Sequence, residues 1–356
     1  MRRRQATLLA ALAAGSTALL ALGITATGAA AATGGAGTGP GAFSRPLPNQ
    51  VFAPYYEMYD TSTDLAALSQ QSGARYLSLA FLETAASGSC TAYWDGDATQ
   101  PIAPASYGAD IAAIQAHGGN VIPSFGGYTA DTTNTDIADS CTSVAGIAQV
   151  YESLITTYNV PRIDLDVEAD SLTNTAGINR RNEAIALTEA WAAAHHRQIQ
   201  FSYTLPTFPT GLTASGLAVL QNAVADGARI ATVNLLTFDY YLGTQQDMVA
   251  DTESAAAGLF SQLQSLYPTA PARQLWHMIG VTEMPGIDDF GTDETFSTAN
   301  AVTILNWARH QGIGLISFWA LQRDNGGCPG TKGAGACSGV TQPTWYFSHV
   351  FEHFTS

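Results

Sequence analysis

The segment that decides the fold reads PRIDLDVE over residues 161–168. Apolar and acidic residues alternate in it with a period of two, which predicts a β-strand. Because the side chains of a strand point alternately to its two faces, Asp164, Asp166 and Glu168 share one face and lie roughly 6.6 Å apart along it. Neighbouring carboxylates repel one another, so we expect at least one of them to hold its proton near neutral pH. The pattern predicts a strand that carries acid–base chemistry.

Two other interpretations of this strand start from the same residues. An edge strand could present the acidic face to solvent, or the carboxylates could bind calcium. Calcium sites use a curved loop and backbone carbonyl oxygens, which a regular strand does not supply. Burying carboxylates that are neither paired nor used is unfavourable. We therefore favour an acid–base site over both alternatives.

The composition is that of a large acidic protein. The chain has 356 residues, of which 46% are hydrophobic and 12% charged, enough apolar residues for one α/β barrel. The formal net charge of −15 argues against nucleic acid or an anionic membrane surface as a partner. The histidines and cysteines show no metal-site spacing. We expect a monomer.

The N-terminus predicts an export signal. Arg2 to Arg4 form a basic start, residues 6–24 are apolar, and Ala29 to Ala31 offer a small-residue cleavage site. We expect a signal peptide over residues 1–32, with a retained membrane anchor as the alternative. Residues 33–49 are rich in Gly and Pro and predict a linker. The mature protein is expected to be secreted, extracellular and free of the membrane.

Four cysteines in an exported chain suggest two disulfide bonds, with three possible connectivities. We favour Cys328–Cys337, which closes a Gly-rich loop, and Cys90–Cys141, which joins two loops on one side of the fold.

One structural unit repeats along the rest of the chain. Strand-like runs are expected near residues 51–56, 76–82, 120–125, 162–168, 198–205, 231–239, 275–281 and 313–319. Helix-like runs follow them near residues 65–72, 111–116, 144–157, 182–194, 215–225, 254–266, 299–309 and 346–354. Strands that alternate with helices predict a parallel sheet, and eight such units predict an α/β fold of the (β/α)₈ TIM-barrel type. We expect a single catalytic domain over residues 50–356.

In such barrels the chemistry lies at the C-terminal ends of the strands. We expect Glu168 to end the fourth strand at the mouth, with Asp166 and Asp164 beneath it. The ends of other strands bring polar and aromatic residues to the same mouth, namely Ser124, Tyr203, Asp239, Tyr240, Glu283 and Trp319. Acids for proton transfer and aromatic faces for stacking suit a carbohydrate substrate.

These residues resemble glycoside hydrolase family 18, the chitinases and their relatives. The family signature DxxDxDxE is matched by Asp164, Asp166 and Glu168, while Pro161 replaces its first Asp. Three further segments resemble the motifs of strands three, six and eight: SFGG at 124–127, NLLTFDY at 234–240 and SFW at 317–319. The run from 278 to 325 resembles the bacterial chitinase D-type branch.

The resemblance implies roles for the acidic residues. Glu168 would protonate the glycosidic oxygen while the substrate's own 2-acetamido group attacks the anomeric carbon, with net retention. Asp166 would orient the acetamide and share a proton with Asp164. No metal or organic cofactor is implied.

The resemblance also implies substrate contacts. Trp319 would form the floor under the sugar, and Asp239, Tyr203 and Gly127 of the SFGG motif are further candidates. Phe238 stands where many members have a tyrosine, so we expect Tyr240 to supply the hydroxyl that holds the acetamide.

Three functions are compatible with these motifs. The first is a secreted chitinase that cleaves β-1,4 bonds between N-acetylglucosamine units, with chitin or its oligosaccharides as the partner. The second is an endo-β-N-acetylglucosaminidase that acts on N-glycans by the same mechanism. The third is a non-catalytic chitin-binding lectin, against which the retention of Glu168 and both aspartates argues.

Overall fold

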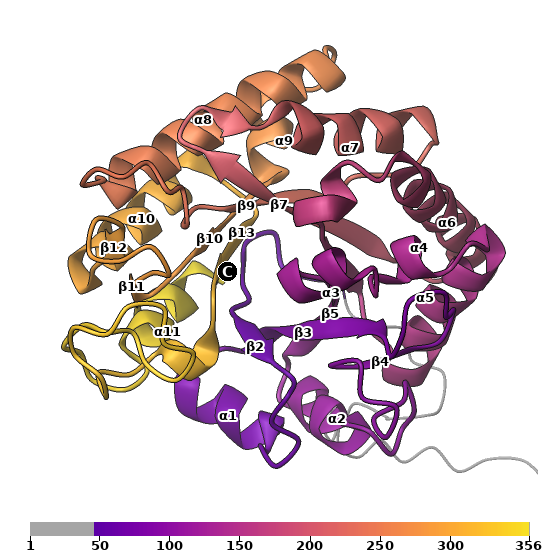
Figure 1. Ribbon diagram of the computed structural model, residues 1–356, viewed down its shortest axis with the longest axis horizontal. Helices are drawn as coiled ribbons and strands as arrows, with labels where there is room; N and C mark the ends of the chain where they lie inside the picture. Colours follow the sequence, from indigo (N-terminus) through magenta and orange to yellow (C-terminus); the bar gives the residue numbers. More distant parts are fainter. Residues whose placement is uncertain (1–45, 356) are drawn as a thin grey trace, which may run out of the picture. The chain divides into compact units, whose positions relative to one another are not determined.

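The computed structural model describes residues 46–355. The predicted signal peptide and residues 33–45 of the predicted linker lie outside the described residues. Within them, parallel strands form a barrel with helices around it (Figure 1). The barrel strands are β1 (Val51–Phe52), β2 (Tyr55–Glu57), β3 (Tyr76–Thr84), β5 (Asn120–Gly126), β6 (Arg162–Asp166), β7 (Gln200–Phe208), β9 (Thr232–Leu236), β10 (Ile279–Glu283) and β13 (Leu315–Phe318).

The barrel closes through its first strand, which is split at residues 53–54. Its first half, β1, pairs with β13, and its second half, β2, pairs with β3. The Ala53 N–H donates to the Ile316 carbonyl at 3.0 Å, and the Pro54 carbonyl accepts from Ser78 at 2.9 Å. The two edges of the sheet are thereby joined, as the predicted TIM barrel requires.

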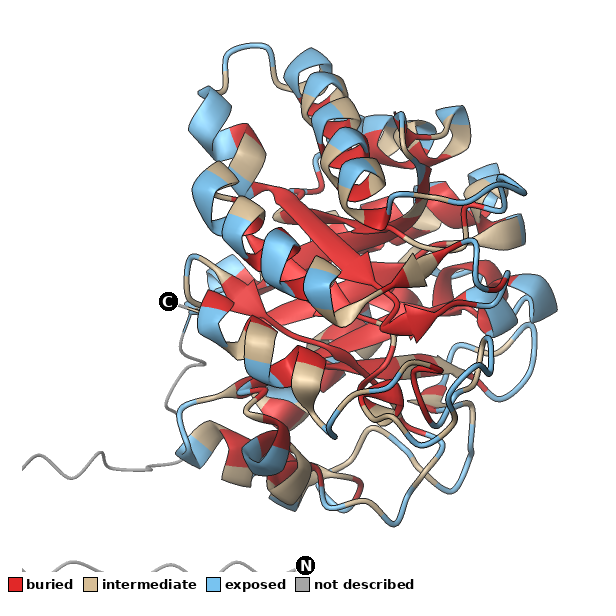
Figure 2. Ribbon diagram, turned by 90° about the vertical axis from the view of Figure 1, so that its left-hand side faces the viewer, coloured by how far each residue is buried: buried red, intermediate tan, exposed pale blue. Residues whose placement is uncertain are grey.

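Helices cover the outside of the barrel. They are α1 (Leu65–Ser72), α2 (Gly108–Ala116), α5 (Val144–Tyr158), α6 (Thr175–Ala194), α7 (Ala214–Ala225), α8 (Met248–Leu266), α10 (Thr298–Gln311) and α11 (Tyr346–Phe351). Figure 2 shows buried strands inside and helices whose outer faces are exposed. The strand side chains follow the predicted alternation: Ile163 and Leu165 belong to the apolar core, while Asp164 hydrogen-bonds with Ser202 on neighbouring β7. The apolar core thus lies between barrel and helices, and polar side chains occupy the barrel interior.

The loops carry short elements that the sequence did not predict. At the C-terminal ends of the barrel strands lie α3 (Tyr128–Thr133), α4 (Ile137–Ser140), the antiparallel pair β11 (Gly286–Ile287) and β12 (Thr295–Phe296), and the 3₁₀ helices η1 (Ala169–Leu172) and η2 (Leu321–Arg323). The others are β4 (Ala92–Trp94), β8 (Gly211–Leu212) and α9 (Ala272–His277), while the predicted helix over 346–354 consists of α11 followed by the 3₁₀ helix η3 (Glu352–Phe354).

Several predicted strand boundaries were wrong, and β9 ends at Leu236 where the sixth strand was expected to reach residue 239. Residues 275–277 belong to helix α9, and β10 begins only at Ile279. The fourth strand, β6, ends at Asp166, so Glu168 lies two residues beyond it and precedes η1. A short apolar run does not distinguish a buried helix from a strand, which explains the error at residues 275–277.

Both expected disulfide bonds are present. Cys90–Cys141 spans 51 residues and Cys328–Cys337 spans 9. Between residues 46 and 355, no helix combines the length and the apolar character needed to cross a bilayer.

Candidate active site

Asp164 is the innermost carboxyl of the acidic row and lies in a cage of hydroxyl groups. Its oxygens accept hydrogen bonds from Ser202 at 2.6 Å, Ser124 at 2.7 Å, Tyr55 at 2.8 Å and Thr204 at 3.0 Å. Burial raises the pKa of Asp164, and these four donors oppose that rise because they favour the charged form. The four hydroxyls come from three barrel strands, Tyr55 from β2, Ser124 from β5, and Ser202 and Thr204 from β7. The barrel itself therefore fixes this group.

Asp166 and Glu168 follow toward the open end of the barrel. Asp166 is only 3% exposed, and its Oδ1 atom has no hydrogen-bond partner among the described residues. Burial, and after it the charges of Glu168 and Asp164, raise the pKa of Asp166 well above its usual value. Burial also raises the pKa of Glu168 to about 7. The row therefore retains protons near neutral pH, and Glu168 can act as a general acid there.

A cavity of about 540 Å³ opens over this row. Asp166 and Glu168 line it together with residues from the ends of several barrel strands. Its remaining charged residues are also acidic, namely Glu57, Glu83, Asp95, Asp239 and Asp289. Among residues 46–355, no group of three His, Cys, Asp or Glu side chains is arranged to hold a metal ion.

Aromatic side chains form much of the cavity wall. The rings of Phe81 and Trp319 stack with their centroids 5.5 Å apart and their planes at 16°. Tyr55 packs against Trp319 at 5.6 Å and also donates to Asp164, so it connects the aromatic wall to the acidic row. The other aromatic lining residues are Tyr59, Tyr128, Phe238 and Phe290. Flat apolar faces beside protonated carboxyl groups are suited to binding sugar rings.

Two curated relatives are similar to this chain over most of its length. A "Probable bifunctional chitinase/lysozyme" of Escherichia coli (strain K12) is 33% identical over 322 residues, which make up 86% of this chain and 35% of that protein. "Endochitinase 11" of Metarhizium anisopliae is 32% identical over 290 residues, or 78% of this chain and 53% of that protein. The chain therefore spans only part of each relative. No model of a protein family matches it.

The barrel is also similar to solved structures. Active domain 2 of the thermostable chitinase from Pyrococcus furiosus, solved with chito-oligosaccharides, superposes with a TM-score of 0.78 at 28% identity and covers 88% of this chain and 97% of that one. The catalytic domain of the chitinase from the same organism gives a TM-score of 0.76, also at 28% identity. The chain is therefore similar to chitinases both in sequence and in the fold of the barrel. The acidic row on β6 and the cavity above it lie at the C-terminal strand ends, where such a barrel carries its chemistry.

Tyr240 does not line this cavity, contrary to our expectation. Its neighbour Asp239 adopts a left-handed conformation with φ of 54°, and Tyr240 packs into the core, where its backbone N–H donates to Glu294 at 2.7 Å. Its hydroxyl is buried without a hydrogen-bond partner among the described residues. Asp239 and Phe238 do line the cavity, as does Trp319. The strand-six hydroxyl expected to hold an acetamide is therefore not supplied by Tyr240.

Tyr203 and Gly127 also lie outside the cavity lining. Tyr203 points outward from β7 and donates to Asn182 of α6 at 2.8 Å, because Ser202 and Thr204 on either side of it face the barrel interior. Gly127 begins helix α3, and a β-carbon there would lie 2.4 Å from the Phe81 ring. This glycine therefore allows α3 to pack tightly against the aromatic wall, and Gly126 is the cavity-lining residue of the pair.

Glu283 was expected at the mouth but is fully buried behind β10. Its Oε1 atom accepts from Thr252 of helix α8 at 2.9 Å. Burial raises the pKa of Glu283 to about 8. Between the ordinary pKa of glutamate and this value, the unfolded chain ionises while the folded protein keeps its proton. The contribution of Glu283 to stability therefore falls as pH rises from about 4 to about 8.

We expect Glu283→Gln to make the free energy of unfolding less dependent on pH. Glutamine keeps an oxygen for Thr252 and removes the ionisation. The free energy of unfolding of the variant, minus that of wild type, should rise by more than about 1.4 kcal/mol from pH 5 to pH 8. This amount is the equivalent of one pKa unit. Urea denaturation at both pH values measures this. A difference in the free energy of unfolding that is the same at both pH values would contradict the raised pKa of Glu283.

Several cavity residues were missed by the sequence analysis. Phe81 lies at a register shift of β3 between Ala80 and Leu82, so strand alternation does not reveal which way it points. Glu57 ends β2, and burial raises its pKa to about 7. Its position at the end of the first strand was the only available signal. Phe290 comes from the loop between β11 and β12, for which the sequence offered no signal.

Proposed function

We propose that this barrel hydrolyses the β-1,4 bonds of chitin and its N-acetylglucosamine oligosaccharides by substrate-assisted catalysis. The observation that carries the proposal is the row of Asp164, Asp166 and Glu168, which rises from the barrel interior into an aromatic-walled cavity. The similarity to chitinases over 86% and 78% of the chain supports the same substrate class. The motif run from 278 to 325 supports the finer placement in the chitinase D-type branch.

In the proposed first step, Glu168 donates its proton to the glycosidic oxygen and the leaving sugar departs. The acetamide oxygen of the substrate forms a bond to the anomeric carbon, which gives an oxazolinium ion. The free Oδ1 atom of Asp166 suits the acetamide N–H, whose acidity increases as the ring forms. As Glu168 gives up its proton, the row gains a negative charge, which stabilises the developing positive charge. Water then opens the ring, Glu168 accepts its proton, and the anomeric configuration is retained.

A panel of substrates tests the function. We expect the wild-type protein to shorten N-acetylglucosamine hexamers. Release of glycans from an N-glycosylated protein without cleavage of the hexamer would instead indicate an endo-β-N-acetylglucosaminidase. Binding to chitin without hydrolysis of either substrate would indicate a lectin.

We expect Trp319→Ala to raise KM for the hexamer about tenfold, equivalent to about 1.4 kcal/mol of binding. The substitution removes the ring that stacks on Phe81 and faces the cavity. Trp319→Phe keeps an aromatic face and should lose less than half of that free energy. Initial rates at varied hexamer concentration give both values. An unchanged KM in Trp319→Ala would show that this ring does not bind the sugar.

We also propose that the protein is secreted. The N-terminal pattern over residues 1–32 and two disulfide bonds support export to an oxidising compartment. Detection of a processed chain in the culture medium tests this, and retention of the full-length chain inside the cell would contradict it.

A further inference from the structure

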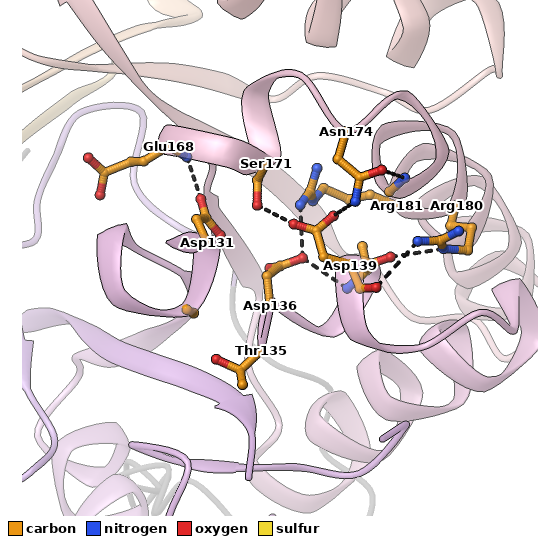
Figure 3. A network of polar contacts seen from close by, with 12 residues as sticks. Asp131, Thr135, Asp136, Asp139, Glu168, Ser171, Asn174, Arg180 and Arg181 are labelled. Atoms are coloured by element: carbon orange, nitrogen blue, oxygen red, sulfur yellow. Dashed lines mark hydrogen bonds and ion pairs between the residues drawn. The ribbon is translucent and has the colours of Figure 1, made fainter. Parts of the chain in front are cut away.

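A second cluster of buried charged residues lies on the backbone side of Glu168, away from its carboxyl group (Figure 3). It consists of Asp131 on α3, Asp136 before α4, Asp139 on α4 and Arg181 on α6. Each of these side chains is at most 8% exposed. Arg181 donates to Asp136 at 2.8 Å. The mechanism described above uses none of these residues.

One direct hydrogen bond joins this cluster to the acidic row. The backbone N–H of Glu168 donates to Oδ2 of Asp131 at 2.5 Å. Glu168 lies beyond the end of β6. The backbone N–H of Val167 still donates to the Thr204 carbonyl of β7, but the pairing between β6 and β7 ends there. Asp131 thus replaces the missing strand partner of this N–H. Figure 3 shows the Glu168 side chain extending away from the cluster.

Helix α3 holds the end of β6 at two points. The Gly127 N–H donates to the Asp166 carbonyl at 3.0 Å, and Asp131 accepts from Glu168 one turn further along the same helix. A β-carbon at Gly126 would lie 2.1 Å from the Asp166 carbonyl oxygen, so glycine is required for this approach. The backbones of both Asp166 and Glu168 are therefore fixed by one short helix.

Asp139 of the cluster fixes the turn after Glu168. Asp139 accepts from Ser171 of η1 and from Asn174 at 2.9 Å. Arg181 compensates the buried carboxylates electrostatically, and the structure gives it a direct ion pair with Asp136. Asp139 thus anchors η1, and the backbone N–H of Asp136 donates to the Ala130 carbonyl of α3 at 3.3 Å, so the cluster contacts the elements on both sides of the Glu168 backbone.

We propose that Asp131 is a positioning residue for the general acid, acting through the backbone N–H of Glu168 to direct its carboxyl group into the cavity. The inference rests on the proposed function in that Glu168 is taken as the acid. A displacement of about 1 Å at a reacting group can reduce a rate about 100-fold. Loss of this hydrogen bond is therefore expected to lower kcat.

The charge of Asp131 is not needed for this role. Burial, and after it the neighbouring Asp136, raise the pKa of Asp131 to about 9, while Arg181 acts in the opposite direction. A neutral carboxyl group accepts the Glu168 N–H, and the amide oxygen of asparagine offers the same acceptor at the same distance from the backbone. Asn is therefore a conservative replacement here, whereas Ala removes the acceptor.

The test compares Asp131→Ala with Asp131→Asn in hexamer hydrolysis. We expect Asp131→Ala to lower kcat about 10-fold to 100-fold with KM within about twofold of wild type. Asp131→Asn should keep kcat within about threefold. Glu189→Ala is the matched control, because it removes a buried carboxylate on α6 whose partner is Arg229, outside the cavity. It should lower thermal stability without lowering kcat. Equal losses in the Ala and Asn variants, or a wild-type kcat in Asp131→Ala, would overturn the inference.

A readout that does not depend on activity separates this inference from the proposed function. Hydrogen exchange of the Glu168 amide, followed by mass spectrometry or NMR, should be faster in Asp131→Ala than in wild type and Asp131→Asn. If Asp131→Ala does not fold, Asp131→Ser takes its place, since its shorter side chain also loses the contact. A protein without hydrolytic activity but with this exchange pattern would reject the chitinase proposal alone. Unchanged exchange in a folded Ala or Ser variant would reject the role of Asp131.

Discussion

Replacing Glu168 with glutamine is expected to lower kcat for N-acetylglucosamine hexamers about 1,000-fold, with little change in KM. Glutamine has nearly the same shape as glutamate and leaves the backbone N–H bonded to Asp131, but it has no proton to donate to the glycosidic oxygen. Burial raises the pKa of Glu168 to about 7, so the wild-type enzyme should lose activity as pH rises through this value. Steady-state kinetics from pH 5 to pH 9 measure both effects.

Retained chitin binding and an unchanged melting temperature are the controls for Glu168→Gln. They show that the loss of rate is chemical and does not come from unfolding. A variant with more than about one tenth of the wild-type kcat would assign the acid to another residue, since removing a general acid typically reduces the rate 100-fold or more.

Asp166→Asn is expected to lower kcat about 100-fold. Asp166 lines the cavity, its Oδ1 atom is buried without a hydrogen-bond partner among the described residues, and the proposed oxazolinium ion places positive charge beside this side chain. Asparagine can neither share a proton with Asp164 nor take up negative charge as the oxazolinium ion forms. The effect should appear in kcat and not in KM, because the positive charge develops only in the transition state.

Glu189→Gln serves as the matched control for Asp166→Asn, since it neutralises a carboxylate that is buried outside the cavity. Its kcat should equal that of wild type. If Asp166→Asn also hydrolysed the hexamer at the wild-type rate, the acetamide of the substrate would not need Asp166, and the substrate-assisted mechanism would fail in its present form.

The sequence predicted the barrel and its acidic row because both depend on local periodicity. The alternation in residues 161–168 places Asp164 and Asp166 inward, as observed, and the order of strands and helices predicts the parallel sheet. The neighbouring hydroxyls of Ser124, Ser202 and Thr204 depend on the register between strands, which periodicity within one strand does not define.

Residues just beyond the strand ends were predicted less well, because single backbone conformations decide where they point. The left-handed conformation of Asp239 accompanies the turn that leaves Tyr240 in the core, and a register shift brings Phe81 into the cavity. Asp131 lies in a short polar helix with no apolar period, and its contact with Glu168 spans 37 residues of sequence. Such contacts arise from tertiary packing, so sequence patterns alone do not reveal them.

The measurement that tests the central claim most directly is the anomeric form of the first product. The wild-type protein would be mixed with the N-acetylglucosamine hexamer, and the new reducing end followed by proton NMR before mutarotation occurs. Substrate-assisted catalysis should release the β-anomer, because the acetamide attacks from one face and water opens the ring from the other. Initial formation of the α-anomer would mean direct attack by water, and would contradict substrate-assisted catalysis at Asp166 and Glu168.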